Sequence, residues 1–306
     1  MGVIGIDTSN YTTSIAFFDG VGGENCSKLL PVKSGELGLR QSDAVFAHIK
    51  SLPELSGRLF SHVRDEIRAV GVSTRPRAVE GSYMPCFLVG LSHATLLSNA
   101  LHVPLVEVSH QQGHVAASLW SAGHLELMDA PHLAWHLSGG TTELLLVEPE
   151  GKLVKCTKIG GTTDISAGQL IDRTGQLLGL PFPSGKHLDA LSREAAGKDF
   201  FRVKCKDMTF SFSGMQNKVQ QYFEANGDPE ETAAYALRCV AYGVFHATQQ
   251  ALKAYPGLPV VFSGGVASNS LLRQVLKPLN PIFAQPQYST DNAMGVAVLA
   301  SRCTEV

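Results

Sequence analysis

The sequence lacks the features of a secreted or membrane protein. It has no Cys-x-x-Cys pair and no regular cysteine spacing, which favours reduced thiols over a disulfide scaffold. No apolar run reaches membrane-spanning length, and no basic segment followed by an apolar core opens the chain. We therefore expect a cytoplasmic protein with no membrane segment. The scattered cysteines are Cys26, Cys86, Cys156, Cys205, Cys239 and Cys303.

The sequence also has little net charge. Its 25 Lys and Arg residues against 27 Asp and Glu give a formal charge of −2, so no overall basic field can hold a polyanion. A nucleic-acid role would need a local basic patch or a partner protein. With 306 residues, 44% of them hydrophobic, the chain is long enough for two lobes of about 150 residues each.

An internal repeat supports two lobes. Residues 133–147, "LAWHLSGGTTELLLV", align with residues 4–18, "IGIDTSNYTTSIAFF", so that Ser138 matches Ser9 and Thr141-Thr142 match Thr12-Thr13. Each copy reads as a strand, a turn rich in hydroxyls, and a second strand, followed by alternating strand and helix patterns. The sequence thus predicts a duplicated α/β fold, with one lobe at 1–125 plus 292–306 and a nucleotide-binding lobe at 126–291.

Three turns have the residues expected of a phosphate site. Two predicted buried strands end in Ser-Gly-Gly, the first at Ser138-Gly139-Gly140 and the second at Ser263-Gly264-Gly265. In such a turn, backbone N–H groups can approach a ligand without a Cβ in the way. Asn269 can cap the helix that follows the second turn. The hydroxyl turn that begins at Thr8 and Ser9 is the third. Together these turns predict a nucleotide site, although Ser-Gly-Gly also occurs in ordinary turns.

Two histidines in "SHQQGHVAAS" can share a metal ion. His110 and His114 are four residues apart on a predicted helix, so both rings project from one face. A pair of ordinary structural histidines is the alternative. A metalloprotease would place Glu after the first histidine, but Gln111 cannot accept a proton there, which disfavours peptidase activity. The carboxylate of Asp291 in "STDNAMG" is a candidate third ligand, with a simple helix cap as the alternative.

These motifs in order resemble the glycoprotease-like (Gcp/TsaD) family, the tRNA N6-adenosine threonylcarbamoyltransferases. The resemblance covers nearly the whole chain through "GIDTS", "SHQQGH", "LSGGTTELL", "SAGQLIDRTGQLLGLPFPSG", "FSFSG", "FSGGVASNSLLR" and "STDN". It implies the two-lobed fold of actin, Hsp70 and the sugar kinases, with ribonuclease-H-like lobes. It also implies transfer of a threonylcarbamoyl group from threonylcarbamoyl-AMP to adenosine 37 of tRNA.

The resemblance assigns roles to individual residues. It implies that His110, His114 and Asp291 bind one iron or zinc ion. It further implies a site for an ATP- or AMP-type nucleotide, with magnesium as a further candidate ion. The residues it places around that nucleotide are Ser138, Gly139, Gly140, Asp172, Gly185, Asp189 and Asn269. Companion proteins of the same pathway are expected to bring tRNA to the chain, in a homo- or heterodimer.

Several positions depart from the family pattern. The usual Cys-Asp-Glu of the first turn is Asn10-Tyr11-Thr12 here, which removes two acidic groups. The Gly-Pro-Gly turn expected near residue 76 is replaced by "RPRAVEGSYMPC", where Arg75 and Arg77 could bind a phosphate or carboxylate or could simply be solvated. Arg40, before a predicted helix, is a further candidate substrate contact.

These departures leave alternative functions open. The chain could be a diverged carbamoyltransferase with a non-tRNA acceptor, or a non-catalytic nucleotide-binding paralogue that acts as a partner subunit. A basic cluster that could hold RNA consists of Lys198, Arg202, Lys204 and Lys206. Asp199 and Asp207 dilute its charge, and most such clusters are solvated surface.

Overall fold

The computed structural model describes residues 1–9, 11–31 and 39–304. These residues form two compact units. Unit 1 comprises Met1–Ala130, Glu148–Cys156 and Thr290–Val306, and unit 2 comprises Pro131–Val147 and Thr157–Ser289. Asp291 therefore belongs to unit 1, together with His110 and His114, whereas the boundary expected from the sequence separated it from them.

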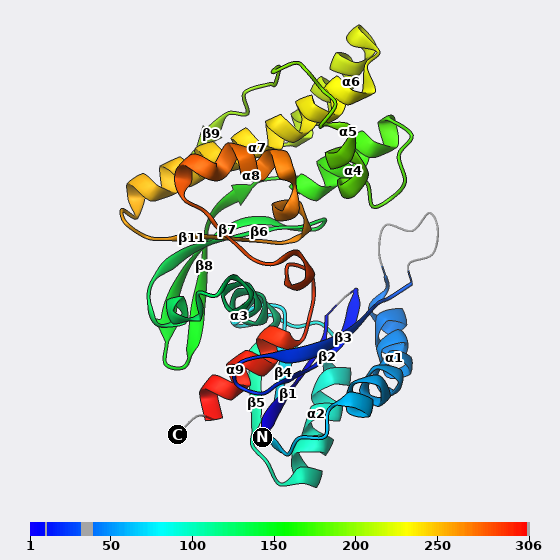
Figure 1. The fold of residues 1–306 in the computed structure, drawn as a ribbon, viewed down its shortest axis with the longest axis vertical. Coiled ribbons are helices and arrows are strands. Elements are labelled where there is room, and N and C mark those ends of the chain that lie inside the picture. Colours follow the sequence, from blue (N-terminus) through cyan, green and yellow to red (C-terminus); the bar gives the residue numbers. More distant parts are fainter. Residues whose placement is uncertain (10, 32–38, 305–306) are drawn as a thin grey trace. The chain divides into compact units, whose positions relative to one another are not determined.

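Unit 1 is built on a five-stranded sheet with the order β3-β2-β1-β4-β5 (Figure 1). Strand β1 pairs antiparallel with β2 and parallel with β4, and β4 pairs parallel with β5. Both β1 and β2 are buried along their whole length, including polar residues at the turn end of each strand: Asp7 and Thr8 in β1, and Thr12, Thr13 and Ser14 in β2. The strands are β1 (Gly2–Thr8), β2 (Thr12–Phe18), β3 (Gly23–Leu29), β4 (Ile67–Arg75) and β5 (Leu105–Ser109).

Helices on this sheet bury its apolar side chains. Leu52, Leu55 and Leu59 of α1 pack with Ile4 and Ile6 of β1 in one core cluster. Helix α9 approaches β1 and β4 closely, because Gly5 and Gly71 leave no Cβ in its way. The helices are α1 (Gln41–His62), α2 (Phe87–Leu101), α3 (His110–Ala122), the short 3-10 helix η1 (Leu125–Asp129) and α9 (Met294–Thr304).

Unit 2 repeats the same sheet plan. Its order is β12-β11-β6-β7-β8-β10-β9, in which β6 pairs antiparallel with β7 and parallel with β11, as β1 does with β2 and β4. The buried indole of Trp135 donates from Nε1 to Thr248 Oγ1 (2.9 Å), joining this sheet to α7. The strands are β6 (His132–Leu137), β7 (Thr142–Glu150), β8 (Leu153–Thr162), β9 (Cys205–Lys206), β10 (Thr209–Phe210), β11 (Val260–Ser263) and β12 (Ile282–Phe283).

The helices of unit 2 include the longest described helix of the chain, α7, which is buried on several faces and carries much of the core. They are α4 (Ala167–Leu177), α5 (Gly185–Leu191), α6 (Ser213–Asn226), α7 (Pro229–Ala254) and α8 (Ser270–Leu276). Short 3-10 helices are η2 (Gly265–Ser268), η3 (Lys277–Leu279) and η4 (Pro286–Tyr288).

The internal repeat is visible in the strand register. In β1 and β2, Val3 faces Phe18 and Thr8 faces Thr13, while in β6 and β7, His132 faces Val147 and Leu137 faces Thr142. Each pair of the second hairpin lies 129 positions after its counterpart in the first. This confirms the predicted duplication of an α/β lobe. Among the described residues, no helix is long and apolar enough to cross a membrane.

Candidate metal and nucleotide sites

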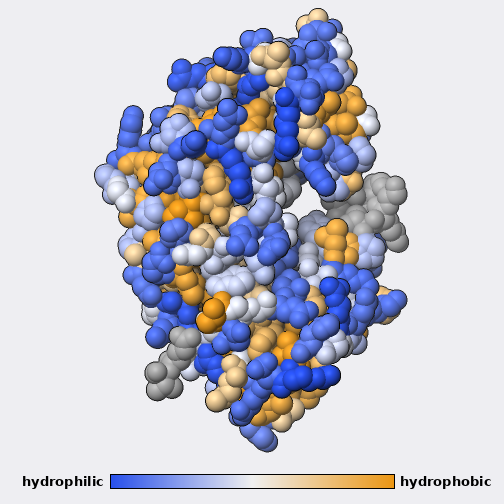
Figure 2. Space-filling model, in the orientation of Figure 1, coloured by the Kyte–Doolittle hydropathy of each residue, from blue (hydrophilic) through white to orange (hydrophobic). Residues whose placement is uncertain are grey.

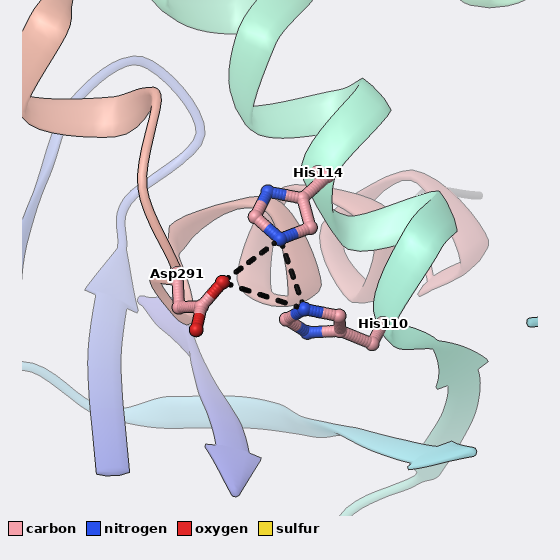
Figure 3. Close-up of side chains that lie close together, drawn as sticks. All are labelled: His110, His114 and Asp291. Carbon is pink, nitrogen blue, oxygen red and sulfur yellow. Dashed lines mark hydrogen bonds and ion pairs between the residues drawn. The ribbon is translucent and has the colours of Figure 1, made fainter. Parts of the chain in front are cut away.

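The metal ligands predicted from the sequence lie together in unit 1 (Figure 3). The Nε2 atoms of His110 and His114 are 2.9 Å apart. Asp291 Oδ1 lies 3.2 Å from His114 Nε2 and 3.5 Å from His110 Nε2. Three ligand atoms about 2.1 Å from one ion in tetrahedral geometry would be about 3.4 Å apart. The observed spacing therefore fits a single metal ion.

Local sequence explains how the two histidines are held. Ser109 ends β5 and caps α3, accepting a hydrogen bond from Gln112 N (3.2 Å), while Gln112 Oε1 accepts one from Ser109 N (2.9 Å). This capping box starts the helix at His110, so that His114 follows one turn later on the same face. Gln112 Nε2 also donates to Val154 O (2.7 Å), which fixes the first turn of α3.

Asp7 is a part of this site that the sequence reasoning missed. It lies on β1, is fully buried, and accepts a hydrogen bond from His110 Nδ1 at 3.0 Å. The hydroxyl of Ser73 donates to the same carboxylate. A carboxylate on the far nitrogen of a ligating histidine fixes its tautomer and directs its Nε2 lone pair toward the metal. A charged residue within the buried run "VIGIDT" is the signal that could have identified it.

Neighbouring charges favour the ionised forms of His110, Asp291 and Asp7. Burial opposes charge on His110, but the carboxylates of Asp7 and Asp291 raise the pKa of this imidazole to about 10. Burial would likewise raise the pKa of Asp291, but hydrogen bonds from His110 and His114 hold it well below its ordinary value. The pKa of Asp7 is lowered in the same way, since His110 outweighs burial.

The site is open enough for chemistry. The side chain of Asp291 is 28% exposed and that of His110 20%, whereas His114 is 9% exposed. Three protein ligands with access from solvent are typical of catalytic metal centres, which keep a position for water or substrate. Ser9 donates to Asp291 Oδ2 (3.4 Å) and so borders this site. The hydroxyl of Thr8 does not bond to the site, because it donates to Cys86 O and accepts from Gly90 N.

In unit 2 the two Ser-Gly-Gly turns are neighbours. They follow β6 and β11, which are adjacent parallel strands with His136 paired to Ser263. Gly264 has a positive φ of 91°, and a Cβ there would clash with the carbonyl of Leu137, so only glycine lets the turns meet. By contrast, a Cβ on Gly139, Gly140 or Gly265 would meet no atom within 4 Å. Open space above these backbones suits a nucleotide.

Helix starts surround the same turns. Ser166, the cap of α4, donates to Gly139 O (2.5 Å), and Thr141 N donates to Ser138 Oγ (3.0 Å), which fixes the first turn. Asn269 caps α8 by accepting from Leu272 N (2.9 Å) and donates from Nδ2 to Asp189 Oδ1 (2.8 Å). The structure thus brings Asp189 and Asn269 together.

The remaining candidates lie at other helix starts and at the end of β4. In unit 2, Asp172 accepts from Ser184 N (2.8 Å), just before Gly185 at the start of α5, and burial raises the pKa of this carboxyl. In unit 1, Arg75 ends β4 and is paired with Ser109, while Gln111 N donates to Pro76 O (3.0 Å). The backbone of the Arg75–Arg77 turn therefore borders the first turn of α3. Arg40 is the exposed cap of α1, and Asn10 lies outside the described residues.

The duplicated fold and the two-histidine, one-carboxylate site define a class: proteins with the actin, Hsp70 and sugar-kinase fold that can hold a metal ion. Solved structures agree on the fold. The chain matches full-length HypF in a phosphate- and nucleotide-bound form with a TM-score of 0.62 and 14% identity, over 100% of this chain and 47% of that one. A ROK family glucokinase from Streptomyces griseus, in complex with glucose and AMPPNP, matches with a TM-score of 0.55 and 11% identity, covering 99% and 100% of the two chains.

Sequence comparison identifies the family. The profile of the tRNA N6-adenosine threonylcarbamoyltransferases matches residues 42–298. A relative of that name from Carboxydothermus hydrogenoformans is 32% identical over 96% of this chain and 90% of its own length. Another, from Thermosipho africanus, is 30% identical over 97% and 92%. The chain therefore belongs to the tRNA N6-adenosine threonylcarbamoyltransferase family, which confirms the resemblance inferred from its motifs.

Proposed function

We propose that this protein transfers a threonylcarbamoyl group from threonylcarbamoyl-AMP to the N6 atom of adenosine 37 in tRNA. The observation that carries the proposal is the convergence of His110, His114 and Asp291 within one site of a chain from this family. In the reaction, N6 attacks the carbamoyl carbon, the bond from that carbon to the phosphate oxygen breaks, and AMP leaves with both bonding electrons. The N6 proton passes to solvent or to a nearby base.

The chain's residues divide this work. His110, His114 and Asp291 would hold one iron or zinc ion, which supplies Lewis-acid polarisation of a carbamoyl or phosphoryl oxygen. Asp7 orients His110 through Nδ1, and Ser9 holds Asp291. The place after the first histidine, where a metalloprotease of this type has its general base, is taken by Gln111, so the same site does not support peptide hydrolysis.

The nucleotide part of the donor would bind in unit 2. We assign its phosphate to the backbone of Ser138, Gly139 and Gly140 and of Gly264 and Gly265, where space is open above the turns. Asn269, held by Asp189, would contact the nucleotide beside them, with Asp172 and Gly185 at the start of α5. Magnesium would accompany an ATP-type nucleotide here. Thr8 of unit 1 is not assigned to the nucleotide, because its hydroxyl is bound to the backbone of Cys86 and Gly90.

Partner proteins are part of the proposal, and the cytoplasm is its proposed location. The neighbouring helices α1 and α2 expose large apolar side chains: Phe46 is 64% exposed, Ile49 48%, Leu88 50% and Leu96 72%. Apolar areas (orange) are visible at the lower end of Figure 2, where Figure 1 draws α2. Exposed apolar patches mark protein interfaces, so these helices would bind a companion protein or a second copy.

A second candidate is transfer to an acceptor other than tRNA. It is favoured by the position of the Arg75–Arg77 turn, which replaces glycines beside the first turn of α3 and so could admit a different anionic group. A nucleotide-binding partner subunit without catalysis is the remaining possibility from the sequence.

The test is a transfer assay with the purified chain. Labelled threonylcarbamoyl-AMP, an unmodified tRNA transcript, zinc or iron(II) and the companion proteins are combined, and label in tRNA and free AMP are both measured. Label in tRNA is the expected result. AMP release without tRNA labelling, when small-molecule amines accept the group instead, would favour the second candidate. Nucleotide binding without any release of AMP would refute both.

A further inference from the structure

A groove in unit 2 gathers four positively charged side chains, although the net charge of the whole chain is only −2. Its volume is about 670 Å³. Its lining includes Arg202 and Lys204 on the segment that leads into β9, Lys206 in β9, and Lys253 on α7. Figure 1 draws β9 and α7 together in this unit. Three of the four cations in the sequence cluster therefore line the groove, without Lys198, and Lys253 joins them from a helix some 50 positions later in the chain.

The spacing of these cations is regular. Arg202, Lys204 and Lys206 are exposed, while Val203 between the first two is buried in the core of unit 2. This alternation of exposed and buried positions is typical of an extended chain, in which side chains two residues apart lie about 6.6 Å apart on one face. A row of charges at this interval suits a row of phosphates along one strand.

The row is fixed against α7. Gln250 donates from Nε2 to Cys205 O (3.1 Å) and accepts from Met208 N (2.8 Å) through Oε1, so one amide holds both sides of the β9–β10 turn. Lys253 follows Gln250 by three positions on the same helix. The groove is therefore formed by two elements that are hydrogen-bonded together, unlike a free solvated loop.

The cations are available to a ligand. Within residues 1–9, 11–31 and 39–304, none of the four has an acidic partner at ion-pair distance, in contrast to Arg193, which pairs with Asp189 at 2.7 Å. The carboxylate nearest in sequence, Asp207, does not line the groove.

Aromatic side chains stand beside the charges. His246 lines the groove, and its ring lies 6.2 Å from that of Tyr242, which stacks on Phe200 at 4.1 Å with 11° between the planes. Basic residues interleaved with aromatic rings are typical of surfaces that bind single-stranded nucleic acid, since phosphates meet cations and bases stack on rings. Anionic lipid would use the charges but has no base to place against His246.

We propose that this groove binds the phosphate backbone of RNA, with a base against His246. The choice of RNA rests on the proposed function, in which tRNA is the acceptor. Through this groove, the chain would bind the acceptor tRNA directly, without a companion protein.

The test is fluorescence anisotropy with a labelled unmodified tRNA transcript and the full chain, without any threonylcarbamoyl donor. The variant Lys204→Glu with Lys206→Glu is compared with the control Lys152→Glu with Lys155→Glu, which changes the same charge on exposed lysines of unit 1. The groove variant should weaken binding at least tenfold and reduce the slope of log K against log salt by about two. The control should change binding by less than about twofold, and melting temperatures should show that both variants fold.

Three outcomes would overturn the inference. Equal binding by the groove variant and the control would place RNA elsewhere. Equal competition by heparin or by vesicles of phosphatidylserine and phosphatidylcholine in equal parts, with no effect of His246→Ala on tRNA binding, would show an unspecific anion surface. Because no donor is present, failure of the transfer reaction leaves this result intact, and a transfer reaction that proceeds with the groove variant unimpaired would refute only the groove.

Discussion

In unit 1 the candidate site is made of side chains, and in unit 2 it is made of backbone. The metal site depends on three ligand atoms within 4.8 Å of one another, contributed by α3 and by the loop before α9. The nucleotide turns depend on glycines with open space above them and on helix starts around them. The two halves share one duplicated strand plan, so the difference arises from the turns and helices that come after equivalent strands. Substitutions in unit 1 should therefore reduce metal binding, whereas substitutions in the turns of unit 2 should reduce stability or nucleotide binding.

The largest effect should come from removing the histidine ligands. Wild-type protein should carry about one iron or zinc per chain, and His110→Ala with His114→Ala should carry almost none, because Asp291 alone cannot hold an ion. Elemental analysis of purified protein measures this directly. His124→Ala is the control, since the His124 side chain is 43% exposed and, among the groups described, pairs with Glu126 far from the three ligands. Equal metal content in the wild type and the double variant would show that His110 and His114 do not bind the ion.

Two adjacent glycines should separate folding from binding in unit 2. Gly264→Ala should destabilise the protein by ~3 kcal/mol, because the left-handed backbone is strained and the new Cβ meets Leu137. Gly265→Ala should leave thermal stability nearly unchanged and weaken nucleotide binding several-fold, because its Cβ enters only the open space above the turn. Calorimetric melting and nucleotide titration check both. Unaltered nucleotide affinity in Gly265→Ala would move the phosphate away from this turn.

Asp7→Asn should weaken metal binding by about 10- to 100-fold without unfolding the protein, as loss of a partner to a ligating histidine does elsewhere. A zinc competition titration measures the affinity. Asp43→Asn, an exposed position in the first turn of α1, removes the same charge without touching the site. If both variants bind zinc equally well, Asp7 has no role in orienting His110.

Metal binding should depend on pH in a defined direction. The pKa of His110 is raised to about 10 in the metal-free chain, above its ordinary value, so this imidazole carries a proton at pH 7 that the metal must displace. Affinity should therefore rise up to about tenfold per pH unit between pH 7 and 9, with release of about one proton per ion. Calorimetry in buffers of different ionisation enthalpy counts that proton. Affinity that does not change over this range would show that His110 is neutral.

The sequence predicts side-chain sites better than backbone sites. His110 and His114 were recognisable because helical spacing places both on one face. Asp291 was a candidate third ligand from its own motif, and the family resemblance implied the same role. Asp7 escaped notice because its role depends on β1 lying beside α3, which spacing along the chain does not reveal. In unit 2 the Ser-Gly-Gly motifs were visible, but the need for glycine at 264 and not at 265 depends on how closely β6 and β11 approach.

The fold followed from the repeat. An alignment of fifteen residues with few identities anticipated two hairpins whose strand pairs correspond position by position, because strand, turn and strand patterns persist when side chains diverge. The unit boundaries are another matter. The tip of the β7–β8 hairpin belongs to unit 1, where Gln112 binds Val154, and a contact of this kind between distant segments leaves no mark in local sequence.

The most direct test of the proposed transferase is restoration of the modified nucleoside in cells. Cells depleted of their own threonylcarbamoyltransferase are supplied with this protein, or with the His110→Ala, His114→Ala variant, and their tRNA nucleosides are measured by mass spectrometry. We predict threonylcarbamoyladenosine with the wild-type chain and none with the variant. Its absence with a folded, metal-loaded wild-type chain and its companion proteins present would contradict transfer to tRNA.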